Sequence, residues 1–177
     1  YIKIAEGCSN ACTYCTIPSI RGPLKSRVPE QIIAETKNLA DQGVTEINLV
    51  AQDVTAYGRD WKKNRTHPLI PLLEALHRID EIHWIRLLYC HPAHLDDYLI
   101  AMTGDSDKIC PYLDIPIQHV STPVLKAMNR PYNEKKLRRL IEKIYSACPD
   151  IALRTTIMAG FPGETEQDIE QLLKFLK

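Results

Sequence analysis

The sequence lacks any apolar run long enough to cross a bilayer, and it lacks an excess of charge of either sign. Its 177 residues include 22 basic and 22 acidic side chains, so the formal net charge is zero. A membrane-spanning helix needs about 20 consecutive apolar residues, so we expect no membrane partner. A neutral chain also has no global field that would attract nucleic acid. What remains is a globular composition, 45% hydrophobic and 25% charged, sufficient for one domain with a sizeable core.

Internal repeats, low-complexity stretches and long linkers are also missing, which favours a single domain over residues 1–177. One local concentration of positive charge interrupts the even distribution of charged residues. It consists of Lys135, Lys136, Arg138, Arg139 and Lys143. The segment is predicted to be helical, and a charge run on a helix is most simply a solvated face. Direct nucleic-acid binding is therefore not indicated by this segment.

Three of the six cysteines lie close together, and no fourth ligand accompanies them. Cys8, Cys12 and Cys15 form a Cys-x-x-x-Cys-x-x-Cys run, and the next cysteine is Cys90. The spacing is too tight for disulfides among the three. A structural zinc ion needs four protein ligands, usually in two separated pairs. Three thiolates instead suit a 4Fe-4S cluster with one iron left open, so we predict this metal centre, with zinc and inert thiols as the alternatives.

The other cysteines are dispersed and indicate a compartment rather than a site. Cys90, Cys110 and Cys148 each lie in an apolar or proline-flanked context. Free cysteines in such contexts are usually buried and behave as small hydrophobic residues. A chain with several unpaired thiols is typical of a reducing cytoplasm, where we expect this protein to act.

Strand-like and helix-like segments alternate along the chain. The expected strands are 1–5, 46–51, 84–89, 112–117 and 151–158. The expected helices are one that Pro29 opens and Gly43 ends, followed by 68–79, 95–102, 123–128, 134–147 and 165–177. Such alternation predicts parallel strands joined by right-handed crossovers, in a barrel or a doubly wound sheet.

Polar residues at the strand ends favour the barrel. They are Gln52, Asp53, His91, Gln118, His119 and Arg154, and the three clustered cysteines also follow a strand. In a barrel the carboxyl ends of all strands meet at one mouth, where active sites are built. The sequence therefore predicts an α/β barrel with a polar, thiol-bearing mouth.

Several motifs together resemble a known family. The cysteine run, with Tyr14 in the aromatic position before Cys15, is similar to that of the radical S-adenosylmethionine enzymes. The motifs that resemble the methylthiotransferases among them are 16–22 with Ser26-Arg27, 51–53, 56–58, 116–119, 124–130 and 160–165. Gln118-His119, together with 56–58 and 112–116, resembles the branch that modifies a ribosomal protein rather than the branch that modifies tRNA. The resemblance covers essentially the whole chain.

The resemblance implies a fold and a domain organisation. The family fold is a partial, TIM-like (β/α)6 barrel, of which this chain would supply about five β/α units. Residues 1–177 would be an incomplete radical S-adenosylmethionine core. An N-terminal domain for a second cluster, the last barrel strand and a C-terminal substrate-binding domain would be absent, so we expect this segment alone not to be competent for the whole reaction.

The resemblance also implies a chemistry. A 4Fe-4S cluster on Cys8, Cys12 and Cys15 would reductively cleave S-adenosylmethionine for methylthiolation of an aspartate in a small-subunit ribosomal protein, using an external electron donor. One alternative is methylthiolation of tRNA adenosine. An alternative of another class is a non-catalytic metal-binding barrel module.

Four further residues are expected to contact the cofactor. Tyr14 lies between two cysteines, so its ring is placed to pack on the adenine. Gln52 and Gln118 could hydrogen-bond S-adenosylmethionine from strand ends. Arg154 could pair with the methionine carboxylate or, alternatively, with a neighbouring acid. His91, His94 and His119 are read as structural histidines, and no catalytic residue is assigned.

Overall fold

The computed structural model describes residues 1–61 and 68–177, and a five-stranded parallel sheet organises them. The strands are β1 (Ile2–Lys3), β4 (Glu46–Val50), β5 (Trp84–Leu87), β6 (Ile109–Asp114) and β7 (Ala152–Arg154), in that spatial order. Each crossover therefore moves the chain by one strand in a constant direction. A small antiparallel pair, β2 (Ala5–Glu6) and β3 (Lys25–Ser26), flanks the cysteine segment.

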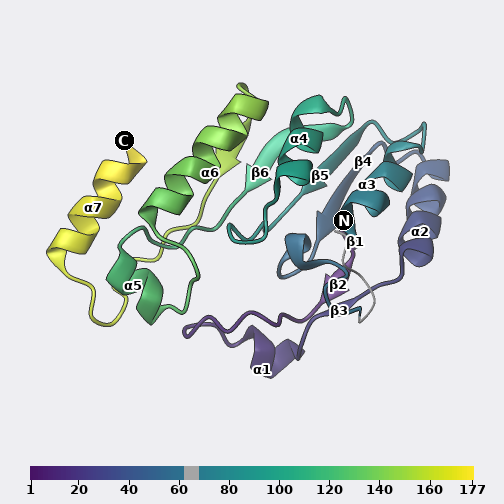
Figure 1. Cartoon of the computed structure of the whole chain (residues 1–177). Helices are drawn as coiled ribbons and strands as arrows, with labels where there is room; N and C mark the ends of the chain where they lie inside the picture. The colour runs from purple at the N-terminus through teal and green to yellow at the C-terminus, as the bar shows by residue number, and fades with distance from the viewer. Residues whose placement is uncertain (62–67) are drawn as a thin grey trace.

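Five helices follow one another along one face of the sheet, as Figure 1 shows from purple to yellow. They are α2 (Pro29–Asp41), α3 (Leu69–His77), α4 (Asp97–Asp105), α6 (Glu134–Ala147) and α7 (Glu166–Leu176). Three short helical elements lie in segments that follow strand ends: α1 (Ile17–Arg21), the 3-10 helix η1 (Val54–Ala56) and α5 (Thr122–Ala127). The crossover helices thus cover the sheet, and the short elements shape its carboxyl edge.

Capping and periodicity explain where the long helices form. Pro29 stands at the first position of α2, where its missing N–H costs nothing. The Asn133 side chain accepts a hydrogen bond from the Lys136 backbone at the start of α6. Thr165 and Asp168 form a reciprocal capping box at α7. These local signals fix the helix starts and so the lengths of the loops at the mouth.

The core lies between the helices and the sheet. Neighbouring strands place apolar residues in register, with Ile47 opposite Ile85 and Leu49 opposite Leu87. All four side chains are at most 1% exposed. The leucines of α3 pack into the same core; they are Leu69, Leu72, Leu73 and Leu76. Burial on this scale anchors the strand ends that carry the polar residues.

The predicted partial barrel of five β/α units is confirmed, but the bounds of three strands are wrong. The expected strand 1–5 divides into β1 and β2, and the expected strand 151–158 is shortened to β7, which ends at Arg154. The expected strand 112–117 is wrong in its bounds, because β6 runs over Ile109–Asp114. Pro111 lies inside β6, and the β5–β6 pairing shifts register between Ile85 and Leu87. A proline cannot donate to the sheet, so a strand containing one is tolerated where the ladder is irregular. No helix in the described ranges 1–61 and 68–177 is long and apolar enough to span a bilayer.

Candidate functional site

The three clustered cysteines lie on a loop between β2 and α1 that is closed at its base. The Cys8 backbone N–H donates to the Gly22 carbonyl at 3.1 Å, and the Leu24 N–H donates to Ser9 Oγ at 3.1 Å. Gly7 begins this loop with φ of +71°, and an added Cβ would lie 2.2 Å from the Pro23 oxygen. Only glycine fits at this position, because the two chain segments at the base of the loop approach each other closely.

The C-terminal end of α5 holds the other side of the loop. The Thr13 N–H donates to the Met128 carbonyl at 3.2 Å, and Thr13 Oγ1 donates to the Ala127 carbonyl at 2.8 Å. Asn129 Nδ2 donates to the Ala11 carbonyl at 2.8 Å. Asn129 has φ of +56°, a conformation that asparagine tolerates better than most residues. The cysteine loop is thus fixed from two directions by protein contacts alone.

The three sulfurs are free, accessible and partly supplied with donors, which fits a thiolate metal centre. Cys8, Cys12 and Cys15 are all free and partly exposed. The Asn10 backbone N–H points at Cys8 Sγ at 3.4 Å, and Arg130 Nη1 lies 3.7 Å from Cys12 Sγ. Burial raises the pKa of the Cys8 thiol, so metal binding must offset the free energy of deprotonating it. Donors aimed at sulfur stabilise the charged thiolate that iron requires.

The sulfur spacing argues against a single ion. A tetrahedral zinc with Zn–S bonds of about 2.3 Å brings its sulfurs to roughly 3.8 Å apart. The group of described ligand atoms that lie within 4.8 Å of one another comprises Asp53, His91 and His94, not the three cysteines. A cluster distributes its thiolates over different irons and accepts the wider separation.

Asp53, at the end of β4, connects the cysteine loop to the barrel. It is 2% exposed, and its Oδ2 accepts from Asn10 Nδ2 at 3.0 Å and contacts His94 Nδ1 at 2.7 Å. Its Oδ1 accepts from Thr55 Oγ1 at 2.5 Å. Burial raises the pKa of Asp53, but hydrogen bonds from His94 and Thr55 outweigh it and bring the pKa to about 2. Asp53 is therefore a buried, ionised anchor for the loop.

The histidines beside Asp53 are better explained as parts of this network than as metal ligands. His91 and His94 stack with ring centroids 4.6 Å apart, and His91 Nδ1 accepts from the Ala93 backbone. Burial, together with the positive charges of Arg130 and His94, lowers the pKa of His91 to about 3. Positive charge next to His91 disfavours a further charge on its ring, so the arrangement supports a neutral, structural His91.

The structure places Tyr14 beside Phe161 and Gln52 beside Glu6. The Tyr14 ring meets the Phe161 ring edge-on with centroids 6.4 Å apart, and burial raises the pKa of Tyr14 to about 12. Gln52 Nε2 contacts Glu6 Oε1 at 3.4 Å, while Gln52 Oε1 is buried without a partner. An unsatisfied amide oxygen at a strand end is available to a ligand donor.

Gln118 and Arg154 lie farther along the sheet. Gln118 is 9% exposed with φ of +65°, and its backbone pairs with Thr156 and Met158 beyond β7. Arg154 Nη1 donates to Asp114 Oδ2 at 2.8 Å. Arg154 thus has the acidic neighbour that was its alternative partner, and contact with a carboxylate of the cofactor remains a prediction.

The turn after β7 is fastened to the turn after β6. His119 Nδ1 accepts from the Ser121 backbone, so its Nε2 carries the proton and faces Glu164 Oε1 at 3.2 Å, although not aligned for a hydrogen bond. Ser121 Oγ also pairs with Asp168. Phe161 lies within the segment so held, which places its ring against Tyr14.

Sequence patterns alone did not single out Arg130 or Asn10. Arg130 contacts Cys12 across 118 residues of sequence, and Asn10 contacts Asp53 across 43. Arg130 follows a short helix and precedes a proline, a context that predicts a turn rather than a ligand contact. Only the fold brings these residues to the sulfurs.

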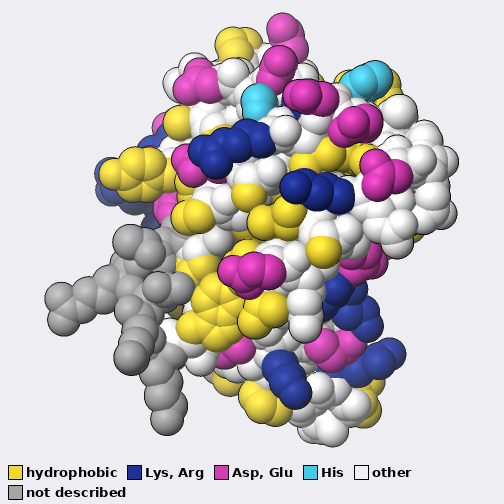
Figure 2. Space-filling model, turned by 90° about the vertical axis from the view of Figure 1, so that its right-hand side faces the viewer, with side chains coloured by type: hydrophobic (Ala, Val, Ile, Leu, Met, Phe, Trp, Pro, Cys, Tyr) yellow, Lys and Arg dark blue, Asp and Glu magenta, His cyan; other side chains and the backbone are white. Residues whose placement is uncertain are grey.

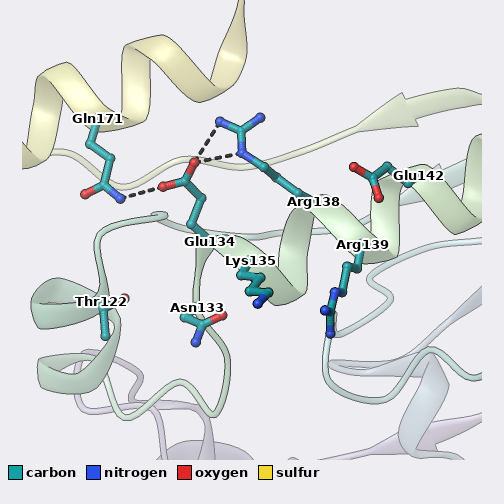
Figure 3. A pocket seen from close by; sticks show the side chains of 8 residues that line it. All are labelled: Thr122, Asn133, Glu134, Lys135, Arg138, Arg139, Glu142 and Gln171. Carbon is teal, nitrogen blue, oxygen red and sulfur yellow. Dashed lines mark hydrogen bonds and ion pairs between the residues drawn. The ribbon is translucent and has the colours of Figure 1, made fainter.

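Two pockets differ in their chemistry. A cavity of about 230 Å³ is lined by the cysteine loop, Asp53 and His94. A wider one of about 520 Å³ lies between α5, α6 and α7, where Glu134 bridges Arg138 and Gln171 (Figure 3). The lining of the second contains no thiol, and its charged groups belong to the surface of α6, where Glu134 and Arg138 pair with each other. The first is therefore the functional candidate.

A parallel partial barrel with three thiols on the loop after its first strand defines a class of metal-dependent α/β enzymes. The family description "Radical SAM superfamily" matches residues 2–176. The chain belongs to this superfamily.

Curated relatives narrow the comparison. The chain is 50% identical over 177 residues to "Ribosomal protein uS12 methylthiotransferase RimO" of Pelobacter propionicus, covering 100% of the chain and 39% of that relative. It is also 50% identical, over 181 residues, to the protein of the same name from Geobacter sulfurreducens, again covering 100% and 39%. The chain thus spans about 39% of the length of these relatives.

Solved structures agree on the fold. The radical S-adenosylmethionine methyltransferase TsrM from Kitasatospora setae superposes with a TM-score of 0.76 at 16% identity, covering 99% of this chain and 33% of that one. The cobalamin-dependent radical enzyme OxsB superposes with a TM-score of 0.71 at 10% identity, covering 98% and 26%. At such identities the likeness concerns architecture.

Proposed function

We propose that this chain is the core of a methylthiotransferase that modifies an aspartate of ribosomal protein uS12 in the cytoplasm. Full-length alignment at 50% identity to proteins of that name carries the proposal. The site supports it, because Cys8, Cys12 and Cys15 fit a 4Fe-4S cluster. When bound, the cluster and S-adenosylmethionine supply reductive cleavage of the sulfonium, with the electron coming from an external donor.

The residues of this chain bind, orient and shield these groups. The proposed ligands are Cys8, Cys12 and Cys15, held by the loop contacts to Gly22 and Met128. Tyr14 and Phe161 provide an aromatic wall beside the sulfurs, suited to the flat adenine. The unsatisfied oxygen of Gln52 accepts a hydrogen bond from the cofactor.

Gln118 and Arg154 complete the proposed cofactor contacts. The positive φ of Gln118 turns the chain at the end of the β6 segment, and the Arg154 side chain is 58% exposed with one carboxylate partner. A guanidinium has five donors, so Arg154 can hold Asp114 and a second carboxylate. A small-subunit ribosomal protein is the proposed macromolecular partner, and the N-terminal cluster domain, last strand and substrate-binding domain are proposed to lie in the rest of a longer protein.

Anaerobic reconstitution tests the proposal. The chain is loaded with iron and sulfide, given S-adenosylmethionine and dithionite, and assayed for 5′-deoxyadenosine. Wild type and Cys148→Ala should form it, whereas Cys12→Ala should not, because Cys148 is remote in sequence and caps α6. Product from Cys12→Ala, or none from the iron-loaded wild type, would refute the assignment.

A further inference from the structure

Arg130 is a buried cation without a carboxylate partner in the described part of the chain. It is 7% exposed. Five other arginines, all with more exposed side chains, each pair with an acid; they are Arg21, Arg27, Arg86, Arg138 and Arg154. A buried charge is costly unless a partner of opposite sign balances it. The described side chains thus leave the charge of Arg130 unbalanced.

The contacts of Arg130 direct its charge at the cysteine loop. Nη1 lies 3.7 Å from Cys12 Sγ, and Nη2 donates to the Pro116 carbonyl at 2.6 Å. The guanidinium carbon is 5.4 Å from the centre of the Tyr132 ring, and Nε is buried without a partner. A carbonyl and a ring only partly replace water around a guanidinium. The missing negative charge is therefore expected on the sulfur side.

The backbone fixes this orientation. The Arg130 N–H donates to the Leu125 carbonyl at 2.8 Å, which ties the residue to α5. The preceding Asn129 side chain bonds the Ala11 carbonyl, next to Cys12. Arg130 and Cys12 are thus held together by contacts on both sides.

We propose that Arg130 is the built-in counter-charge of the cluster, bonded to the Cys12 sulfur, and that it raises the cluster's reduction potential. This inference rests on the proposed function, because it requires the cysteines to carry a cluster. Reduction adds an electron to the site, and a fixed cation stabilises the more negative state. Hydrogen bonds to the sulfurs and local charge are the means by which proteins set iron–sulfur potentials.

Arg130→Met and Arg130→Lys separate charge from packing. Methionine fills much of the space without charge, and lysine keeps the charge without the planar fork. In a redox titration followed by electron paramagnetic resonance, the methionine variant should have a midpoint about 59 mV more negative, a tenfold loss of reduced cluster at fixed potential. The lysine variant should stay near wild type. Arg138→Met, on the exposed face of α6, is the control and should not shift the midpoint.

The apo protein gives an independent readout. Removing an unbalanced buried cation should leave the apo melting temperature of Arg130→Met equal to or above that of wild type. A fall in that temperature would assign Arg130 a structural role and overturn the proposal. If Arg130→Met retains no iron while Arg130→Lys does, the cluster needs the positive charge at this position, as proposed. Loss of iron from both variants would contradict a role for the charge.

Two further results would also count against the counter-charge. An unchanged midpoint in Arg130→Met with weaker S-adenosylmethionine binding would assign the guanidinium to the cofactor carboxylate. Failure of wild type to bind any cluster would refute the proposed function itself, and the apo melting temperature would then still show whether Arg130 is unbalanced.

Discussion

At the scale of single residues, His91 and Asp53 respond to pH in different ranges. His91 is held neutral, because burial and neighbouring cations lower its pKa to about 3 from 6.5. Asp53 is held ionised, because hydrogen bonds outweigh burial and lower its pKa to about 2 from 3.8. The unfolded chain binds more protons than the folded one between about pH 6.5 and 3 at His91, and between about 3.8 and 2 at Asp53.

We predict that the apo chain loses stability as pH falls below 6.5 and that His91 causes much of the loss. Each pH unit inside the His91 window costs about 1.4 kcal/mol, so the loss by pH 4 is of the order of 3 kcal/mol. Asp53 contributes little there, because its window begins lower. Urea unfolding between pH 4 and 7 measures the slope, which His91→Gln should flatten.

His83→Gln is the matched control, because His83 is exposed and it is its backbone N–H that donates to the Thr45 carbonyl. It should keep the wild-type slope. A His91→Gln slope equal to that of wild type would show that another group titrates.

At the scale of elements, Gly7 is the tightest point of the cysteine loop. We predict that Gly7→Ala unfolds the loop base and abolishes iron binding, because its Cβ would lie 2.2 Å from the Pro23 oxygen and 2.6 Å from the Gly22 oxygen. Gly43→Ala is the matched control: its φ is also positive, at +88°, but nothing lies within 4 Å of the added carbon. The control should lose only about 1 kcal/mol of unfolding free energy, the cost of left-handed backbone.

Urea unfolding and iron content per chain measure both variants. Equal losses in Gly7→Ala and Gly43→Ala would show that the loop base relaxes around the new methyl group.

The capping box of α7 offers a second test at this scale. Thr165→Ala removes the oxygen that accepts from the Asp168 N–H, which should cost about 1 kcal/mol of unfolding free energy. Thr165→Ser keeps that oxygen and should restore most of the stability. Chemical denaturation of the three proteins decides, and equal stability of the alanine and serine variants would contradict a capping role.

These elements also show which parts of the fold could be predicted from the sequence. Helix starts at Pro29, Asn133 and Thr165 were predictable, because caps act within one turn. The bounds of β6 were not, because Pro111 argues locally against a strand that tertiary pairing nevertheless forms. The short β2–β3 pair and α1 were also missed, since two-residue strands and a five-residue helix have too few residues for a periodic pattern.

The same distinction between local and long-range signals applies to the candidate site. Three thiols within eight residues are a local pattern, so the metal-binding loop was predicted from spacing. The contacts by which α5 and Arg130 hold and charge the loop join residues 114 to 118 positions apart, such as Thr13 with Ala127 and Arg130 with Cys12. Nothing in a single sequence specifies such pairs before the topology is known.

At the scale of the whole molecule, charge is dispersed. Figure 2 shows Lys and Arg side chains interspersed with Asp and Glu over the face that carries α2 and α3. On α6, Arg138 pairs with Glu134 and Lys143 with Asp97. A surface of this kind exerts no long-range attraction on a partner of either charge.

The β7 side of the molecule is its apolar face. A groove of about 260 Å³ lies between β7, α6 and α7, lined by residues that include Leu137, Leu153 and Phe175. Leu173 and Leu176, which are neighbours of Phe175 in α7, are 54% and 50% exposed. In the described sheet β7 pairs only with β6, so its second edge offers free hydrogen-bonding groups.

We predict that the chain self-associates through this face at high concentration. Light scattering after size-exclusion chromatography should show mass rising with concentration, and Leu173→Glu with Leu176→Lys should reduce the rise. Tyr98→Lys replaces a 77% exposed aromatic on α4 and serves as the control. If it suppresses association equally, general surface hydrophobicity is responsible rather than the β7 face.

The cysteine positions limit what the chain can do as a whole. Methylthio transfer needs a sulfur donor in addition to the first cluster. The thiols left over are dispersed: Cys90 is fully buried after β5, Cys110 is buried within β6, and Cys148 caps α6. Cys110 lies at the start of β6 and Cys148 precedes β7, so both are away from the carboxyl edge of the sheet, where the cysteine loop lies. They are poorly placed to build a second cluster beside the first.

We therefore predict that these 177 residues form 5′-deoxyadenosine but do not methylthiolate uS12. Mass spectrometry of uS12 after anaerobic incubation with the reconstituted chain, S-adenosylmethionine and dithionite should show no added methylthio group. The same incubation must yield 5′-deoxyadenosine, so that inactivity of the cluster is not mistaken for lack of a donor. A methylthio group on an aspartate would show that a donor exists within this chain, and Cys148→Ala would then test the most accessible of the remaining thiols, because Cys148 alone of the three is only partly buried.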